Sequence, residues 1–418
     1  MTGARGRPAG RLLGGPATLI STLLLAAVIA GCAHFARSSG GAWIATWQAS
    51  PQLTEDRNMP PAPLAGATIR QIAHVTLGGS RWRVRLSNEF GDRPLVVSSG
   101  AVARSIGADR VDVSSHATLT FAGDTTVSIP PGSFVWSDEL NESVPSRTEI
   151  AITLHMTGVP ARLTGHPGSR TTSFIVPGNH VRDPALQSAV KTEHWYVISG
   201  LEVLAPTGAA AVVVLGNSIA DGRGSGTDKN NRWPDNLARR LQQDSRTPLV
   251  AVLNAGIGGN AVLRGGLGPT ALERFDRDVL KQRGVRWLIV SEGVNDLGGS
   301  RPDSAMSTAS QLLDAYRRFI DLAHARGIRV YGATVLPFGG SFYDAPERQE
   351  ARGRVNEWVR HGGLFDAVID FDVALRDPAN PSRLRGDADS GDHLHPNENG
   401  YRLMADAIDL ALFRNDHQ

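Results

Sequence analysis

The sequence predicts an α/β fold: a three-layer domain with a parallel sheet between helices, preceded by an antiparallel β-sandwich-like domain. Two observations predict this division. From about residue 41 to residue 205, apolar and polar residues alternate at the period of two that is typical of half-buried strands. After residue 205, short apolar runs alternate with stretches of helical period, the pattern of a parallel sheet with helical crossovers. We therefore expect a β-rich domain over residues 41–205 and a second domain over residues 206–418.

Residues 1–31 have the layout of a signal peptide. Three arginines and no acid precede an apolar run over residues 17–30, which is too short to span a membrane comfortably. The only cysteine, Cys32, follows Ile29-Ala30-Gly31, a stretch that resembles the lipobox of bacterial lipoproteins. We expect export, with lipidation at Cys32 in the cell envelope or release outside the cell, and a linker over residues 32–40. The alternative is an ordinary cleavage site with an incidental cysteine.

Charge and composition narrow the range of partners. The formal net charge of +2 at pH 7 falls to −1 once the three arginines of the predicted signal peptide are removed. This balance does not indicate nucleic acid or an anionic membrane surface as a partner, so a membrane is expected only through a lipid on Cys32. No cluster of His, Cys or carboxylate residues has metal-ligand spacing, and we expect neither a metal nor another cofactor.

Three runs carry the strand period in the β-rich domain. Trp82, Val84 and Leu86 alternate with arginines, and the same period returns at residues 117–121 and 150–156. We expect the histidines of this region, His166 among them, to be structural or solvated. Its tryptophans suit either core packing, which we expect for most of them, or stacking on sugar rings. They are Trp43, Trp47, Trp82, Trp136 and Trp195.

The second domain shows five strand candidates and at least four helices. Each strand candidate is a short, apolar, β-branched run, and the helices show apolar residues three and four positions apart. The predicted strands are residues 211–215, 249–253, 285–290, 328–334 and 368–371; the predicted helices begin near residue 233, cover residues 312–323 and 348–360, and follow Pro396.

Ser218 lies in a tight turn directly after the first of these strands. Open α/β sheets form their sites at the carboxyl ends of strands, so Ser218 is a candidate nucleophile, and a simple turn is the alternative. Three further stretches are expected at the same edge of the sheet as Ser218. Residues 254–260 and 293–296 each follow a strand, and residues 392–396 (Asp-His-Leu-His-Pro) precede the last helix.

In order and spacing, these four stretches resemble the SGNH (GDSL-type) hydrolase family over residues 210–412. The resemblance implies that Ser218 is the nucleophile, His395 the catalytic base and Asp392 the partner of that base. It also implies an oxyanion hole made of the backbone amides of Ser218 and Gly259 and the side-chain amide of Asn295.

One position departs from the family pattern. The family signature is Gly-Asp-Ser, whereas this chain has Asn217 before the serine. Asparagine keeps the size of aspartate and accepts hydrogen bonds through its carbonyl oxygen, but it carries no charge. We expect an active enzyme with an altered pH dependence.

Several neighbouring polar residues have competing interpretations. His393 is an alternative base to His395, and Asp387 and Asp389 are alternative partners for the histidine. Glu292 is predicted to be a solvated loop acid rather than a partner of the catalytic groups. Asp296 is predicted to shape its loop.

These features predict an exported serine esterase that hydrolyses carboxylic esters. The two-domain layout resembles carbohydrate acyl esterases, including xylan deacetylases. That resemblance implies acetyl or other short acyl groups, on a polysaccharide or a small molecule. Two alternatives stay open: a lipase, lysophospholipase or O-acyltransferase with the same triad, and a non-catalytic glycan-binding lipoprotein whose hydrolase core decayed at Asn217.

Overall fold

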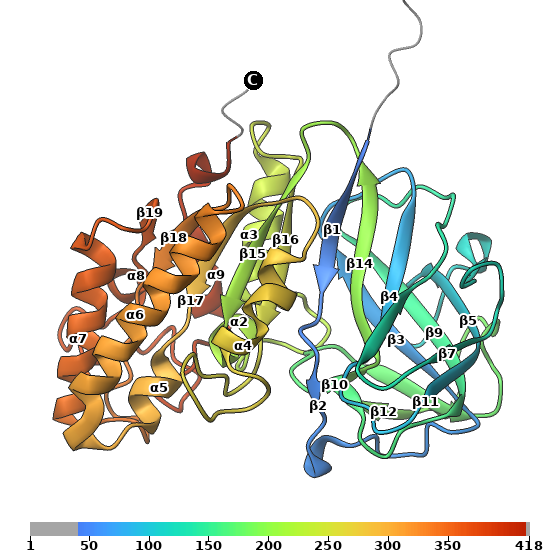
Figure 1. Ribbon diagram of the computed structural model, residues 1–418, viewed down its shortest axis with the longest axis horizontal. Helices are drawn as coiled ribbons and strands as arrows, with labels where there is room; N and C mark the ends of the chain where they lie inside the picture. The colour runs from blue at the N-terminus through green and yellow to red at the C-terminus, as the bar shows by residue number, and fades with distance from the viewer. Residues whose placement is uncertain (1–40, 415–418) are drawn as a thin grey trace, which may run out of the picture. The chain divides into compact units, whose positions relative to one another are not determined.

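The computed structural model describes residues 41–414, which pack as one compact unit. The predicted signal peptide, the linker and Cys32 lie outside the described residues and stay predictions. Within the described part of the chain, no helix has the length and apolar character needed to cross a membrane. We call residues 42–205 the β region and residues 210–414 the α/β region, because the sheets change from antiparallel to parallel between them (Figure 1). Separate folding of the two regions stays a prediction.

The β region is built from antiparallel sheets that enclose apolar side chains, as the alternating pattern predicts. The four-stranded sheet has the order β1-β14-β4-β8, and the largest has the order β12-β11-β3-β9-β5-β6. Trp82, Val84 and Leu86 of β4 all point into the core. The strands are β1 Ala42–Gln48, β2 Gln52–Leu53, β3 Ala67–Val75, β4 Trp82–Asn88, β5 Leu95–Arg104, β6 Ala117–Thr118, β7 Val127–Ile129, β8 Ser133–Trp136, β9 Thr148–Gly158, β10 Thr164–His166, β11 Ser173–Pro177, β12 Val190–Thr192, β13 Trp195–Tyr196 and β14 Ile198–Ala205.

One predicted strand is shorter than its pattern indicates. Residues 117–121 were expected to continue as a strand, but β6 ends at Thr118. Phe121 instead pairs with Asp124 across a tight turn, its amide donating to the Asp124 carbonyl at 2.8 Å. The apolar side chains still face the core, so the alternating pattern correctly predicts which residues are buried. The length of the strand is set instead by the turn at Gly123.

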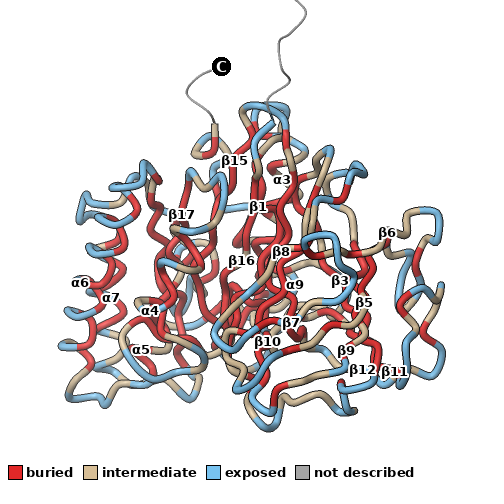
Figure 2. Tube along the Cα trace, turned by 45° about the vertical axis from the view of Figure 1, so that its right-hand side comes forward, coloured by how far each residue is buried: buried red, intermediate tan, exposed pale blue. Residues whose placement is uncertain are grey.

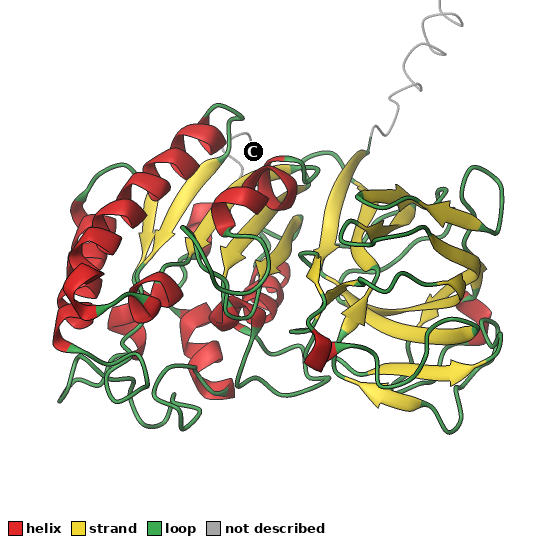
Figure 3. Cartoon of the chain, turned by 60° about the horizontal axis from the view of Figure 1, so that its bottom comes forward, coloured by secondary structure: helices red, strands yellow, loops and turns green. Residues whose placement is uncertain are grey.

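The α/β region contains a five-stranded parallel sheet with the order β16-β15-β17-β18-β19. Helices α3 and α9 pack on one face, and α4, α6 and α7 pack on the other, as right-handed crossovers require (Figures 1 and 3). The strands are β15 Ala210–Gly216, β16 Val250–Gly256, β17 Val285–Ser291, β18 Arg329–Ala333 and β19 Ala367–Ile369. The helices are α2 Ser218–Asp221, α3 Trp233–Gln243, α4 Ala271–Phe275, α5 Val294–Gly299, α6 Ala305–His324, α7 Pro346–His361, α8 Phe371–Leu375 and α9 Glu398–Asp406.

The two regions share one hydrophobic core. The buried residues of β1 and β14 belong to the same cluster as those of β15, β16 and β17, and Figure 2 shows this buried interior running through both regions. Hydrogen bonds join the regions as well: the Val252 amide of edge strand β16 donates to the Thr76 hydroxyl at 3.1 Å. The β region is therefore held firmly beside the carboxyl ends of the parallel strands.

Candidate active site

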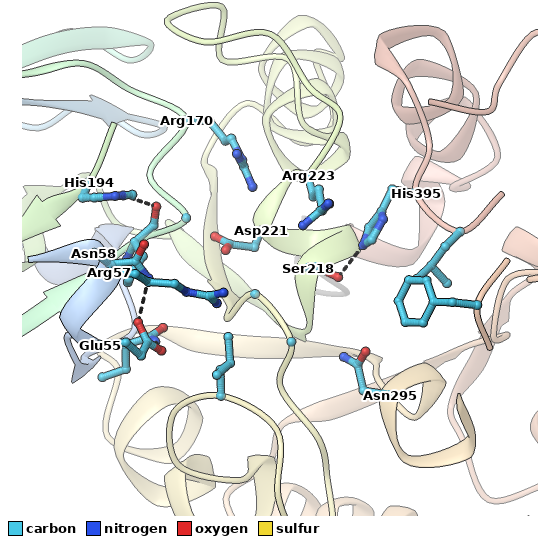
Figure 4. Close-up of a pocket in the computed structure, with 18 of the residues that line it drawn as sticks. Glu55, Arg57, Asn58, Arg170, His194, Ser218, Asp221, Arg223, Asn295 and His395 are labelled. Atoms are coloured by element: carbon cyan, nitrogen blue, oxygen red, sulfur yellow. Dashed lines mark hydrogen bonds between the residues drawn. The ribbon is translucent and has the colours of Figure 1, made fainter. Parts of the chain in front are cut away.

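Ser218 is the first residue of α2, at the carboxyl end of the central strand β15. Asn217 caps this short helix, its side-chain oxygen accepting from the Ile219 amide at 3.0 Å. Gly216 is required before it, because a Cβ at that position would lie 2.5 Å from the Ala220 side chain. The turn thus directs the Ser218 hydroxyl toward the last helix of the chain, and Ser218 Oγ lies 2.9 Å from His395 Nε2 (Figure 4).

Asp392 holds His395 within a single turn. Its Oδ2 lies 2.7 Å from His395 Nδ1, and its Oδ1 accepts the backbone amides of Leu394 and His395 at 3.0 and 2.8 Å. Although burial opposes ionisation, these hydrogen bonds lower the pKa of Asp392 to about 2. Burial lowers the pKa of His395 below its ordinary value, and the Asp392 carboxylate offsets part of that effect. At pH 7 the ring is therefore neutral and able to accept a proton.

Ser218, Gly259 and Asn295, the three residues of the expected oxyanion hole, line the same cavity. Within residues 41–414, neither the Ser218 amide nor the Gly259 amide has a protein acceptor. Gly259 has a φ of +71°, a left-handed conformation that glycine adopts without strain. Asn295 donates one amide hydrogen to the Asn260 carbonyl at 2.7 Å and accepts from the Tyr343 hydroxyl at 2.9 Å. Its orientation is fixed, and its second amide hydrogen stays available.

The competing histidine and acids lie elsewhere. The His393 ring is half exposed and contacts Asp389, with Nδ1 at 2.6 Å from the carboxylate. Asp387 pairs with Arg385 on the surface. Of the two histidines in this turn, the structure places His395 at Ser218.

Glu292 is buried, and the prediction of a solvated loop acid was wrong. Its side chain is fully excluded from solvent, accepts from Asn217 Nδ2 at 3.2 Å and lies 3.3 Å from the Arg274 guanidinium. Burial raises the pKa of Glu292 to about 8, although Arg274 opposes the shift. Asp296 shapes its loop as predicted, accepting the Val262 and Leu263 amides at 2.9 Å each.

Arg274 is a site residue that the sequence reasoning missed. It is fully buried and donates to the carbonyls of Gly216 and Ala255 at 2.9 and 2.6 Å. It also contacts Asn260 Oδ1 at 3.0 Å, and so connects the ends of β15 and β16 with the loop that carries Gly259. An available signal was an arginine on the apolar face of a helix, between Ala271 and Phe275.

A buried contact ties α2 to the β region. His166 of β10 lies with Nε2 at 2.8 Å from Asp221 Oδ1, and its Nδ1 lies 3.0 Å from the Ser50 carbonyl. Both side chains are excluded from solvent, so His166 is structural, one of the two roles predicted for it. Asp221 lies one helical turn after Ser218, so this contact fixes the helix that carries the serine.

The Ser218 hydroxyl opens into a cavity of about 330 Å³ that both regions line. The α/β region supplies apolar side chains, among them Leu267, Phe342 and Leu394. Most of the side chains from the β region are polar (Figure 4). They are Gln52, Glu55, Arg57, Asn58, Arg170 and His194. Within the described residues, no group of three or more His, Cys, Asp or Glu side chains is arranged to hold a metal ion.

We expect the Asn217→Asp variant to equal or exceed wild-type activity at pH 6 and to lose stability more steeply as the pH rises above 8. The new carboxylate would face Glu292 and raise its pKa further. A carboxyl whose pKa is higher in the folded than in the unfolded protein stabilises the fold at low pH. That stability is lost as the pH rises through the folded pKa. Melting temperatures and initial rates between pH 5 and 9 measure both effects.

The double variant Asn217→Asp/Glu292→Gln is the control, because it removes the titrating group and should flatten the added pH dependence. A large loss of activity in Asn217→Asp at pH 6 would contradict the expectation and assign Asn217 a role of its own.

Residues 214–403 match the GDSL-like lipase/acylhydrolase family. A search of curated proteins found no match. Similar solved structures include a G-D-S-L family protein from Desulfitobacterium hafniense (22% identity, TM-score 0.36, covering 47% of this chain and 97% of that one). An acetyl xylan esterase is also similar, with 20% identity and a TM-score of 0.37, covering 47% of this chain and 96% of that one. An acetylxylan esterase from Geobacillus stearothermophilus has 19% identity and a TM-score of 0.36, covering 47% of this chain and 91% of that one.

Proposed function

We propose that the protein is a carboxylic ester hydrolase, a serine esterase with Ser218, His395 and Asp392 as its triad; the match of residues 214–403 to the GDSL-like lipase/acylhydrolase family supports this proposal. The observation that carries this proposal is the 2.9 Å contact between Ser218 Oγ and His395 Nε2. The 2.7 Å contact between His395 Nδ1 and Asp392 supports it, because it keeps Nε2 free to accept a proton.

The proposed reaction proceeds through an acyl-enzyme. His395 Nε2 takes the Ser218 proton while Oγ attacks the ester carbonyl carbon. The carbonyl oxygen becomes an oxyanion that accepts hydrogen bonds from the Ser218 and Gly259 amides and from Asn295 Nδ2. His395 then gives the proton to the leaving alcohol as the ester C–O bond breaks. Water, deprotonated by His395, attacks the acyl-enzyme and releases the acid, and the proton returns to Ser218.

We expect kcat/KM to rise with pH along a single titration of His395, with a midpoint below the ordinary imidazole pKa of 6.5. His395 must be neutral to accept the serine proton, and its lowered pKa keeps it neutral into mildly acidic solution. Asp392, with a pKa of about 2, stays ionised throughout. Rates on p-nitrophenyl acetate from pH 4 to 9, corrected for spontaneous hydrolysis, give the midpoint. A midpoint above 7 would contradict the assigned base.

We propose acetyl or another short acyl group on a saccharide as the substrate. The cavity at Ser218 is about 330 Å³, at the lower end of the range for ligand pockets, which suits a short acyl group better than a long chain. A second cavity of about 530 Å³ shares Gly259, Asn295 and Tyr343 with it, so the substrate panel includes longer esters. The polar wall from the β region suits a hydroxylated alcohol. A panel of acetylated xylan, p-nitrophenyl esters of graded length and phospholipids tests this choice. Preference for long-chain esters or phospholipids would favour the lipase or lysophospholipase alternative.

The non-catalytic glycan-binding alternative has little support in the β region. Trp47, Trp82 and Trp195 are buried. Trp43 and Trp136 flank the Arg83 guanidinium, whose carbon lies 4.7 and 4.8 Å from their ring centres. These rings therefore pack within the protein rather than offering a face to a sugar.

Export and lipidation of Cys32 also remain our proposals. A Cys32→Ser variant expressed in a bacterial host should leave the membrane fraction, whereas unchanged fractionation would count against a lipid anchor.

A further inference from the structure

We infer that the substrate carries an anionic group, a carboxylate or a phosphate on its alcohol part, which binds among Arg57, Arg170 and Arg223. This inference rests on the proposed esterase function and specifies the substrate of the same site. All three arginines line the cavity that opens at Ser218. In the view of Figure 4, Arg57 lies on the side of His194, Arg223 lies beside His395, and the Asp221 carboxylate lies between Arg57 and Arg170.

Two of these cations come from the β region and lack partners. Arg57 belongs to the short 3-10 helix Asp56–Asn58, and Arg170 follows β10. Within residues 41–414, neither guanidinium group has a carboxylate within 4.0 Å or donates a hydrogen bond to the protein. The Arg170 Nε atom is also buried without a partner. A buried donor without an acceptor is unfavourable, and an oxyanion in the cavity would supply the acceptor.

Arg223 belongs to the α/β region and lies nearer the proposed catalytic groups. Its Nε is 3.9 Å from Asp392 Oδ2, longer than a hydrogen bond, and its side chain is 64% exposed. Arg223 can therefore turn toward a bound anion without breaking a hydrogen bond.

The acids in the cavity do not cancel these charges. Only Glu55 and Asp221 contribute carboxylates to its lining, against three guanidinium groups. Glu55 accepts from Gln52 and Asn58 at 2.9 and 2.8 Å, and Asp221 Oδ1 contacts His166. These contacts leave both carboxylates charged, and Asp221 Oδ2 is itself buried without a partner among the described residues. With three arginines against two acids, one positive charge remains in excess in the lining of the cavity.

This excess disfavours reaction with a neutral substrate. Burial is the main cause of the lowered pKa of His395, and the charges of Arg223 and Arg170 lower it further. The same charges oppose the imidazolium that forms when His395 takes the serine proton. An anion bound between the arginines would offset that repulsion, so an anionic substrate gains in turnover as well as in binding.

The test uses two pairs of acetyl esters that differ by one anionic group. Acetylated methyl galacturonide is compared with acetylated methyl galactoside, and acetylated glycerol phosphate with acetylated glycerol. We expect kcat/KM about tenfold or more higher for the anionic member of at least one pair, with a preference that shrinks as salt is raised. The pair with the larger ratio identifies the source of the anion as a sugar acid or a phosphate.

Arginine variants test whether these side chains cause the preference for anionic esters. Arg57→Gln and Arg170→Gln should each bring the anionic-to-neutral ratio closer to one, and Arg104→Gln, on an exposed strand end of the β region, should leave the ratio unchanged. Equal kcat/KM within both pairs, or a preference that survives the double variant Arg57→Gln/Arg170→Gln, would overturn the inference. Failure to hydrolyse even p-nitrophenyl acetate would instead overturn the proposed function, so the two failures are distinguishable.

Discussion

The Ser218→Ala variant should lose hydrolysis of p-nitrophenyl acetate by a factor on the order of 10⁴ to 10⁶ and keep its fold. The hydroxyl makes the bond to the acyl carbon, and among residues 41–414 its only hydrogen bond to a side chain is with His395. Alanine removes one oxygen from a position that a small side chain fills, so the melting temperature should change little. Initial rates on p-nitrophenyl acetate and a thermal melt measure the two expectations.

Two controls separate a chemical role from a structural one. Ser310→Ala, on the exposed side of α6, should keep full activity. The double variant Ser218→Ala/His395→Ala should be no slower than Ser218→Ala alone, because the members of a triad act as a unit. A serine-reactive phosphonate should label the wild type and not Ser218→Ala. Retained activity in Ser218→Ala would reject the nucleophile assignment.

The Arg274→Met variant should lose about 3–5 kcal/mol of unfolding free energy. Arg274 is fully buried and donates to the carbonyls of Gly216 and Ala255 and to Asn260 Oδ1. Methionine replaces the aliphatic part of the side chain but supplies no donor, so these oxygens would remain buried without partners, at about 1–3 kcal/mol each. Its loss also leaves Glu292 without a nearby cation.

Urea denaturation measures this loss, and Arg246→Met is the matched control. Arg246 is exposed and pairs with Asp244 on the surface, so its replacement should change the unfolding free energy by less than about 1 kcal/mol. A loss below 1 kcal/mol in Arg274→Met would show that the buried network does not hold the strand ends together.

The sequence determined much of the fold because periodicity reports burial directly. The five parallel strands lie within a few residues of the predicted runs, and β4 and β9 follow the predicted alternation. The sheet order explains why the motifs converge. Parallel strands end at one edge, so the residues after β15, β16 and β17 meet there. His395 precedes α9 and follows no strand, so its pairing with Ser218 was predicted only through the resemblance to the SGNH family.

What the sequence could not supply was the surroundings of these residues. Packing between distant segments buries Glu292 and brings His166 to Asp221. It also lets Arg274 connect the ends of β15 and β16. Arg57 and Arg170 reach the pocket only because the β region lies against the edge strand β16. A polar residue on a loop has the same local pattern whether it is solvated or enclosed. Only the tertiary structure decides which, because enclosure depends on what other parts of the chain bring over it.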